Sequence, residues 1–230
     1  MTALIVDNDF WDLFPDAQIY TIELSGLNNQ IPTDQSDYQT MLNNAEEEAK
    51  SFLSAADFKD NEIIADWRMV LTKFKKKKGA RASIEALLKR VSQGRTFSPI
   101  NPLVDIYNSI SLEYGVLCGG EDLDKIVGPM HLGIAKGDEE FFPIGETKND
   151  PPRDGEVIYY DEAGAICRSL NWRDGERTML TEETTNAILI IEGITPAQKK
   201  RAEAAVTELR DKVRDYLRIE GKINSFTKNQ

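Results

Sequence analysis

The 230-residue sequence is poor in the residues that most metal and disulfide chemistry needs. Its only cysteines are Cys118 and Cys167, and its only histidine is His131. A structural zinc site uses about four Cys, His or carboxylate ligands at short spacings, and no segment has such spacing. Two cysteines also exclude a disulfide-stapled miniprotein, and we expect both thiols to be reduced and buried. We therefore expect no metal and no other cofactor.

Long apolar runs and common catalytic signatures are missing as well. No stretch approaches the roughly 18 apolar residues that span a bilayer, so we expect no membrane partner. The acidic N-terminus does not resemble a signal peptide, and we expect a cytoplasmic location. Neither a GxSxG elbow nor a phosphate-binding glycine loop occurs, which excludes classical serine hydrolases and nucleotide phosphate cradles.

Acidic residues outnumber basic ones, and the charge is unevenly distributed. The formal net charge is −11, made of −12 over residues 1–66, +9 over 67–95 and −8 over 96–230. The acidic total excludes a uniformly basic nucleic-acid binder, and we expect no DNA partner. The basic block can still dock RNA, or it can be a solvated turn between helices. The candidate RNA-binding residues are Lys73, Lys75, Lys76, Lys77, Lys78 and Arg81.

Hydrophobic periodicity predicts an α+β fold with a mixed or antiparallel sheet and flanking helices. Helices are expected over residues 36–53, 61–74, 83–94, 101–115 and 195–217. The expected N-caps of the last four are Asn61, Ser83, Asn101 and Thr195. Strands are expected over residues 19–24, 130–134, 141–144, 156–160, 165–170 and 187–191. We expect residues 1–62 to form a strand and helix segment that packs on a main domain over 63–220. Residues 221–230 are polar and predict a frayed tail.

Two polar clusters in the middle of the chain are candidates for chemistry. Asn101, Asp105 and Asn108 recur at steps of three or four, which places them on one face of a helix. Paired glycines, Gly119 and Gly120, are followed at once by carboxylates; glycines let a backbone approach a ligand closely. The alternatives are a solvated helix face and a simple turn.

A third cluster joins an aromatic ring to guanidinium groups. Arg168, Asn171, Trp172 and Arg173 can together stack on a base or ring and bind a phosphate or carboxylate. The alternative for Trp172 is a place in the core. A fourth polar cluster, centred on Thr184, leads into an apolar strand and can equally be a strand edge.

Several separated motifs together resemble one family. NPLVDIYNSISLEYG, GGEDLDKI, EVIYYDEAGAICRSLNWR and TEETTNAILIIEG occur in the order seen in free-standing B3/B4 domain proteins. These proteins are relatives of the tRNA-binding and editing domain in the β subunit of bacterial phenylalanyl-tRNA synthetase. The resemblance covers roughly residues 63–220. It implies a mixed α+β body with a pocket that hydrolyses a misattached amino acid.

The resemblance can be carried over residue by residue. Asp105 and Asn108 match the helix motif of the editing domain, and Thr184 fits the pattern before a strand. Gly119 stands where the editing histidine belongs. Glu192 aligns with the pocket glutamate only after a shift.

These matches lead to a tRNA-binding protein, with a trans-acting aminoacyl-tRNA deacylase as its possible activity. Asp105 and Glu121 are the candidates for orienting a water molecule. The candidate substrate-binding residues are Asn101, Asn108, Gly119, Gly120, Asp122, Arg168, Asn171, Trp172, Arg173, Thr184 and Glu192. One alternative is a non-catalytic binder of tRNA or of an amino-acid-like small molecule, which the missing histidine favours. Another is an interaction protein that uses its acidic N-terminal segment.

Overall fold

The computed structural model describes residues 4–228 and has an α+β fold, which confirms the predicted class. The helices are α1 (Asn8–Leu13), α2 (Ser36–Ala49), α3 (Glu62–Val70), α4 (Ser83–Ser92), α5 (Pro102–Tyr114) and α6 (Pro196–Leu217). Short 3₁₀ turns occur at Lys50–Phe52, Phe58–Asp60 and Leu123–Lys125. The strands are β1 (Leu4–Val6), β2 (Gln18–Ser25), β3 (Leu117–Asp122), β4 (Met130–Ile134), β5 (Val157–Asp161), β6 (Gly164–Arg168), β7 (Arg173–Asp174), β8 (Asn186–Gly193) and β9 (Lys222–Phe226).

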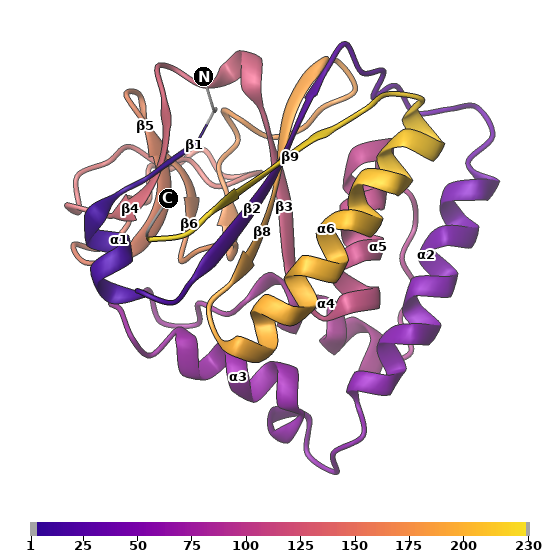
Figure 1. Ribbon diagram of the computed structural model, residues 1–230, viewed down its shortest axis with the longest axis horizontal. Coiled ribbons are helices and arrows are strands. Elements are labelled where there is room, and N and C mark those ends of the chain that lie inside the picture. Colours follow the sequence, from indigo (N-terminus) through magenta and orange to yellow (C-terminus); the bar gives the residue numbers. More distant parts are fainter. Residues whose placement is uncertain (1–3, 229–230) are drawn as a thin grey trace.

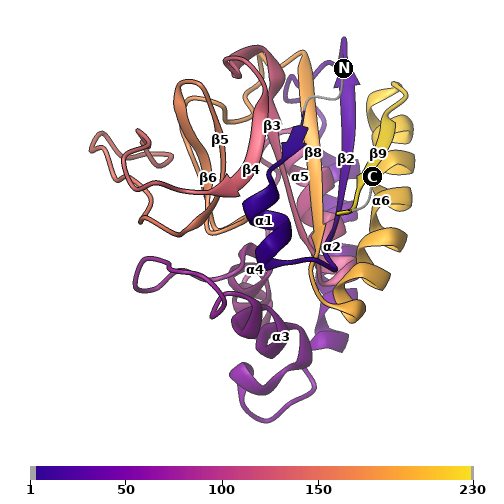
Figure 2. The same cartoon turned by 60° about the vertical axis from the view of Figure 1, so that its left-hand side comes forward.

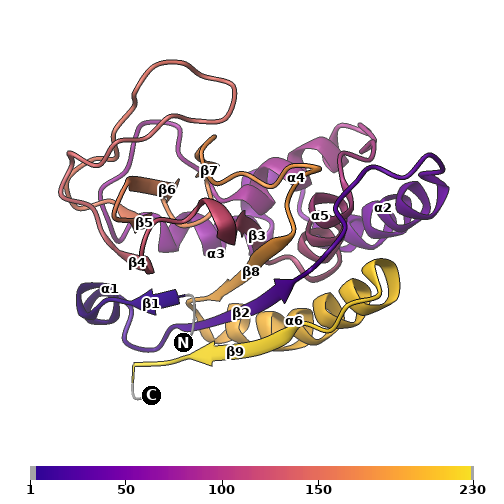
Figure 3. The same cartoon turned by 90° about the horizontal axis from the view of Figure 1, so that it is seen from above.

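The strands form two sheets that face each other. One has the order β3-β8-β2-β9 and is antiparallel throughout; the other has the order β1-β4-β5-β6-β7, with only β1 and β4 parallel. Figure 2 shows the layers edge-on, with β4–β6 on one side of the four-stranded sheet and α6 on the other. Helices α2, α5 and α6 cover that other face (Figures 1 and 3).

The inner strand β8 of the four-stranded sheet is buried on both faces, and most of its side chains are apolar. Along β8, Ile188 and Ile190 pack toward the second sheet, and Leu189 and Ile191 pack toward the helices. This alternation follows from the two-residue period of a strand. Glu192 continues the row of Ile188 and Ile190, so a carboxyl group points into the space between the sheets.

The ends of two long helices follow the predicted capping chemistry. Asn101 caps α5 by accepting a hydrogen bond from the Val104 amide, and Gly115 ends the helix with φ 62°. Thr195 and Gln198 form a reciprocal capping box at the start of α6. These caps satisfy backbone groups that a helix end leaves unpaired.

Several local predictions are wrong. The strand expected over residues 165–170 ends at Arg168, and the α-helix expected over residues 36–53 ends at Ala49. Residues 141–144 form no strand and make only an isolated bridge between Pro143 and Gly175. Residues 222–226 of the expected polar tail pair with β2 as strand β9, so this part is not frayed, while residues 229 and 230 lie outside the described residues. The third helix ends at Val70, four residues before its expected end, and Ala82 rather than Ser83 is the N-cap of α4.

The N-terminal segment is part of the central architecture. Strand β2 lies inside the four-stranded sheet, between β8 and β9. Its Ile19 packs between the sheets, and its Ile22 packs against the helices. Among residues 4–228, no helix combines the length and apolar character that a bilayer crossing requires.

Candidate functional site

A small polar cavity lies between the two sheets. Its volume is about 10 Å³, which is room for roughly one water molecule. It is lined by Gly119, Gly120, Glu121, Met130, Tyr159, Cys167, Asn171, Asp174, Ile190 and Glu192. We call it the inner cavity. Three of these residues are acids, and none is a lysine, an arginine or a histidine.

Glu192 enters this cavity without a counter-ion. Its side chain is completely buried, and its Oε1 accepts a hydrogen bond of 2.8 Å from the Tyr159 hydroxyl. Its Oε2 has no hydrogen-bond partner among the described residues. Burial raises the pKa of Glu192 to about 8, because desolvation outweighs the Tyr159 hydrogen bond. Glu192 is therefore mostly protonated at neutral pH.

Glu121, on the neighbouring strand β3, is in a similar state. Glu121 is buried and lies on the same face of the sheet as Glu192. Its Oε2 has no hydrogen-bond partner within residues 4–228. Burial raises the pKa of Glu121 well above its usual range, and the charge of Asp174 raises it further. The Thr178 hydroxyl and Arg177 oppose this rise only in part. Burial raises the pKa of Asp174 as well.

A wider pocket adjoins the inner cavity. We call it the outer pocket; its volume is about 280 Å³, near the lower end of small-molecule sites. It is lined by Ile100, Asn101, Val104, Tyr107, Gly120, Ile144, Asp174, Met179 and Leu180. Most of these side chains are apolar, and Ile100 and Ile144 are largely exposed. Gly120 and Asp174 line both spaces, so the two together can accept a ligand with an apolar body and a polar end.

The predicted polar face of α5 separates into different environments. Asn101 lines the outer pocket and also accepts a hydrogen bond of 3.1 Å from Asn29. Asp105 is buried, and its Oδ1 accepts a hydrogen bond of 2.8 Å from the Ile100 amide. Burial raises the pKa of Asp105 to about 6. Asp105 and Asn108 line neither the inner cavity nor the outer pocket.

Two other candidates hold a loop in place. The Thr184 hydroxyl donates a hydrogen bond of 2.8 Å to Asp122 Oδ2, and Asp122 Oδ1 accepts one from the Asp124 amide. Both side chains are buried. They fix the segment before β8 against the end of β3, next to Glu121.

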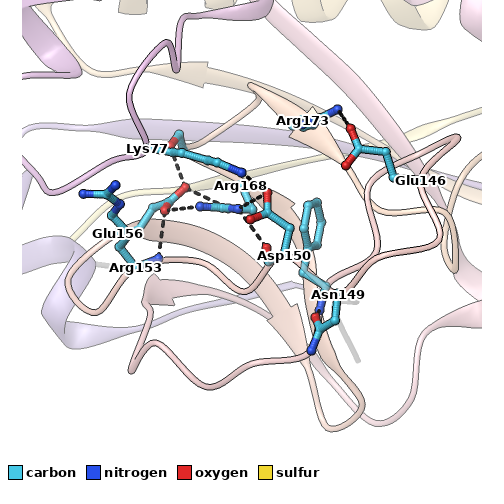
Figure 4. A network of polar contacts seen from close by, with 10 residues as sticks. Lys77, Glu146, Asn149, Asp150, Arg153, Glu156, Arg168 and Arg173 are labelled. Carbon is cyan, nitrogen blue, oxygen red and sulfur yellow. Dashed lines mark hydrogen bonds and ion pairs between the residues drawn. The ribbon is translucent and has the colours of Figure 1, made fainter.

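Arg168 is occupied by internal partners. It is 1% exposed and binds Glu156 through Nε at 3.2 Å and through Nη2 at 2.8 Å. Its Nη1 donates to the carbonyl and the carboxylate of Asp150, at 2.8 and 3.0 Å. Figure 4 shows the guanidinium between these two acids, with Lys77 also paired to Asp150. The structure thus places Arg168 in a buried ion network.

The Asn171–Arg173 segment divides between the cavity and the surface. Asn171 lines the inner cavity, and a Cβ placed on Gly119 would lie 2.2 Å from its Nδ2. Trp172 is half-buried, with its ring 5.8 Å from the Arg168 guanidinium carbon. Arg173 is half-exposed and pairs with Glu146 (Figure 4).

The basic segment forms the loop between α3 and α4. Lys75 pairs with Asp154 at 3.1 Å, Lys77 pairs with Asp150, and Lys76 donates to the Leu71 carbonyl. Within residues 4–228, the exposed cations of this loop that have no ion-pair or hydrogen-bond partner are Lys73, Lys78 and Arg81. These three side chains are free to contact a polyanion.

Four titratable residues that line the two spaces are absent from the candidates predicted from the sequence. The sequence pattern indicates ordinary strand positions for Tyr159 and Cys167. It places Tyr107 in the apolar stripe of α5. Asp174 read as part of a turn with Gly175. No sequence signal marks them, because their proximity depends on the packing of one sheet on the other.

Together these features define a compact α+β domain with a buried acidic cavity beneath an apolar pocket. Residues 66–216, more than half of the chain, match the family described as the B3/4 domain. The chain belongs to this family.

Two known proteins show related segments. The phenylalanine–tRNA ligase β subunit of Fusobacterium nucleatum is 30% identical over 99 residues, which are 43% of this chain and 12% of that protein. An N-terminal fragment of the phenylalanyl-tRNA synthetase β subunit from Pyrococcus horikoshii is 14% identical, with a TM-score of 0.46. That alignment covers 96% of this chain and 49% of the fragment. The matched segment spans 12% of the length of the Fusobacterium nucleatum subunit.

Proposed function

We propose that this chain is a tRNA-binding protein that receives the aminoacyl end of a charged tRNA and hydrolyses its ester bond in trans. The observation that carries the proposal is the pair of buried glutamates, Glu121 and Glu192, whose unpartnered oxygens line a cavity that adjoins an amino-acid-sized pocket. Buried carboxyl groups normally have full sets of partners, so orphaned ones suggest a missing ligand. The name of the related ligase subunit supports a tRNA-linked role.

An aminoacyl ester carries the group that this cavity lacks. Its α-ammonium is a cation about the size of a water molecule, and the acids of the inner cavity have no cation among the other lining residues. A cation nearby lowers the pKa of a carboxyl group. Binding would therefore ionise Glu121 or Glu192, and the amino-acid side chain would occupy the apolar outer pocket.

The ionised Glu121 is the catalytic residue of this proposal. An aminoacyl ester is already activated, so a carboxylate that orients one water molecule is sufficient for hydrolysis. Water adds to the ester carbonyl and its proton passes to Glu121. The bond to the ribose oxygen then breaks as Glu121 gives this proton to the leaving oxygen, which releases the free amino acid and the ribose hydroxyl and restores the carboxylate. Asp105 is held by the Ile100 amide and is not needed for this step.

The charged surface supports docking of the tRNA body. Lys73, Lys78 and Arg81 present free cations on one loop, and the Ser83 amide at the end of this loop donates to the Asn171 carbonyl at 3.1 Å. The basic loop is therefore attached to the turn that lines the inner cavity. A phosphate backbone bound along the loop would lead toward that turn.

Deacylation of a panel of mischarged tRNAs tests this proposal. We expect hydrolysis of at least one member, and Glu121→Gln should slow it by about 100-fold or more. Glu183→Gln, at an exposed glutamate, is the matched control and should leave the rate unchanged. N-acetylated aminoacyl-tRNA lacks the ammonium and should be a poor substrate. No deacylation above background on any tRNA would refute the enzymatic activity.

The second candidate is a non-catalytic binder of tRNA or of an amino-acid-like small molecule. It is favoured by the size of the inner cavity, which at about 10 Å³ does not hold both a substrate group and a water. In this case a stable aminoacyl-adenosine analogue should raise the melting temperature while no deacylation occurs. Arg173→Ala should then abolish the binding, and retained binding would contradict the role of Arg173.

A further inference from the structure

Two consecutive residues before Asn171 adopt a backbone conformation that L-residues avoid. Ser169 has φ 49° and Leu170 has φ 61°, and both are completely buried. Left-handed backbone at a residue other than glycine is strained and persists only where the surroundings enforce it. The chain therefore stores strain at the point where it enters the inner cavity.

Hydrogen bonds hold both residues of this turn in place. The Ser169 hydroxyl donates to Glu156 Oε1 at 2.7 Å, and the same carboxylate binds Arg168 with both of its oxygens. The Leu170 amide donates to the Val157 carbonyl at 3.1 Å. Each residue of the turn is thus fastened to strand β5 or to the segment just before it.

The residue that the strained turn presents is itself left without a partner. Within residues 4–228, the Asn171 carboxamide makes no hydrogen bond, and only the Asn171 main-chain carbonyl is used. The carboxamide occupies the space above Gly119 that any larger residue on β3 would fill. It lines the same cavity as the orphaned oxygens of Glu121 and Glu192.

We infer that Asn171 is a specificity-determining residue: its carboxamide contacts the polar end of the ligand, and its volume limits which ligands enter the inner cavity. Arg168, Glu156 and Ser169 are positioning residues that act through it. This inference rests on the proposed function, because the ligand considered is the aminoacyl end of a tRNA. It also explains why the chain has a buried ion network beside a strained turn.

Binding of stable ligand analogues tests the contact. The probes are 3′-aminoacylamino-3′-deoxyadenosines with alanyl, leucyl, phenylalanyl and tyrosyl groups, titrated into the full chain by calorimetry. Asn171→Ala should weaken the preferred probe by about tenfold, because the polar end of the probe loses its contact with the carboxamide. It should also reduce discrimination against the N-acetylated form of that probe, whose polar end is bulkier. Gly119→Ala should displace the carboxamide and weaken binding similarly. The double variant should be no weaker than either single one, because both changes remove one contact.

The exposed Asn43→Ala on α2 is the matched control and should bind as the wild type does. Unchanged affinity and selectivity in Asn171→Ala would overturn the inference while leaving the proposed function standing. Additive losses in the double variant would also overturn it. If the wild type binds no probe, the proposed function fails and the ligand contact of Asn171 fails with it. The positioning of the carboxamide by Gly119 and the turn is tested separately, without ligand.

The measurement without ligand is the NMR signal of the Asn171 side-chain amide, identified by its absence in Asn171→Ala. Gly119→Ala and Ser169→Ala should both move this signal, because the first crowds the carboxamide and the second releases its turn. Asn43→Ala should not move it. A signal that stays in place in both variants would show that neither Gly119 nor the turn positions the carboxamide, and the inference would be wrong.

Discussion

Two completely buried glutamates, Glu156 and Glu192, lie in opposite chemical environments. Glu156 receives two hydrogen bonds from Arg168, one from the Ser169 hydroxyl and one from the Arg153 amide. Glu192 receives one from the Tyr159 hydroxyl, and its second oxygen is orphaned. The first carboxylate is paired with the Arg168 guanidinium, whereas the second has no cationic partner among residues 4–228.

This difference separates a structural region from a candidate binding region. A buried charge is tolerated only when it is paired and hydrogen-bonded, and an unpaired carboxyl group takes up a proton instead. The network around Glu156 fixes the turn at residues 168–171. Beside that turn, Glu121 and Glu192 each have one oxygen without a hydrogen-bond partner among the described residues, and a ligand could supply that partner.

Removal of the paired glutamate, Glu156, should have the largest effect on stability. Glu156→Ala should lower the free energy of unfolding by about 3 to 5 kcal/mol, because it leaves the Arg168 guanidinium buried with only Asp150 as a charged partner. Chemical denaturation measures this change. A loss below about 1 kcal/mol would show that the pairing contributes little and would remove the contrast with Glu192.

The unpaired glutamate should behave differently. The pKa of Glu192 is about 8 in the folded chain against a usual 4.5, so folding takes up a proton between these values. The free energy of unfolding should therefore fall as the pH rises from about 4.5 to about 8, by up to about 1.4 kcal/mol per pH unit. Glu192→Gln keeps the Tyr159 acceptor without the charge. It should flatten this slope and exceed the wild type in stability at pH 8 to 9, as denaturation at several pH values would show.

Glu121 contributes in the same direction, because its pKa is also raised by burial. The slope should therefore decrease in Glu192→Gln without vanishing. An unchanged pH profile would mean that Glu192 is ionised or solvated in the folded protein. The comparison with Glu156 would then no longer hold.

The sequence predicted the helices and strands better than it predicted which side chains meet at the inner cavity. Apolar periodicity and caps located α5 and α6, since these signals are local. A simple turn was the alternative prediction for Gly119 and Gly120, and it is wrong, because both lie within β3. A side chain at Gly119 would collide with the Asn171 carboxamide, which lies far away in the sequence. The orphaned state of Glu192 and the strain at residues 169–170 depend on packing between the sheets, which no local pattern encodes.

A smaller effect is expected at the basic loop, where paired and unpaired cations can be compared directly. Replacing Lys73 and Lys78 by alanine should reduce the slope of log affinity for tRNA against log salt by about two. Replacing Lys75 and Lys77 should reduce it less, because Asp154 and Asp150 already neutralise them. Filter binding at several salt concentrations measures both slopes. Equal slopes in both variants and the wild type would argue against RNA docking at this loop.

The smallest effect on stability is expected at the surface pair of Arg173 and Glu146. Both side chains are partly exposed, so Arg173→Ala should change the free energy of unfolding by only about 0.2 to 1 kcal/mol. Glu146→Gln removes the same pair but keeps the arginine, which makes it the matched control. If Arg173→Ala loses binding of tRNA or of the analogue and Glu146→Gln does not, the Arg173 guanidinium contacts the ligand directly. Equal binding in both variants would mean that Arg173 does not contact the ligand. Recognition would then depend on Glu121, Glu192 and Asn171 of the inner cavity.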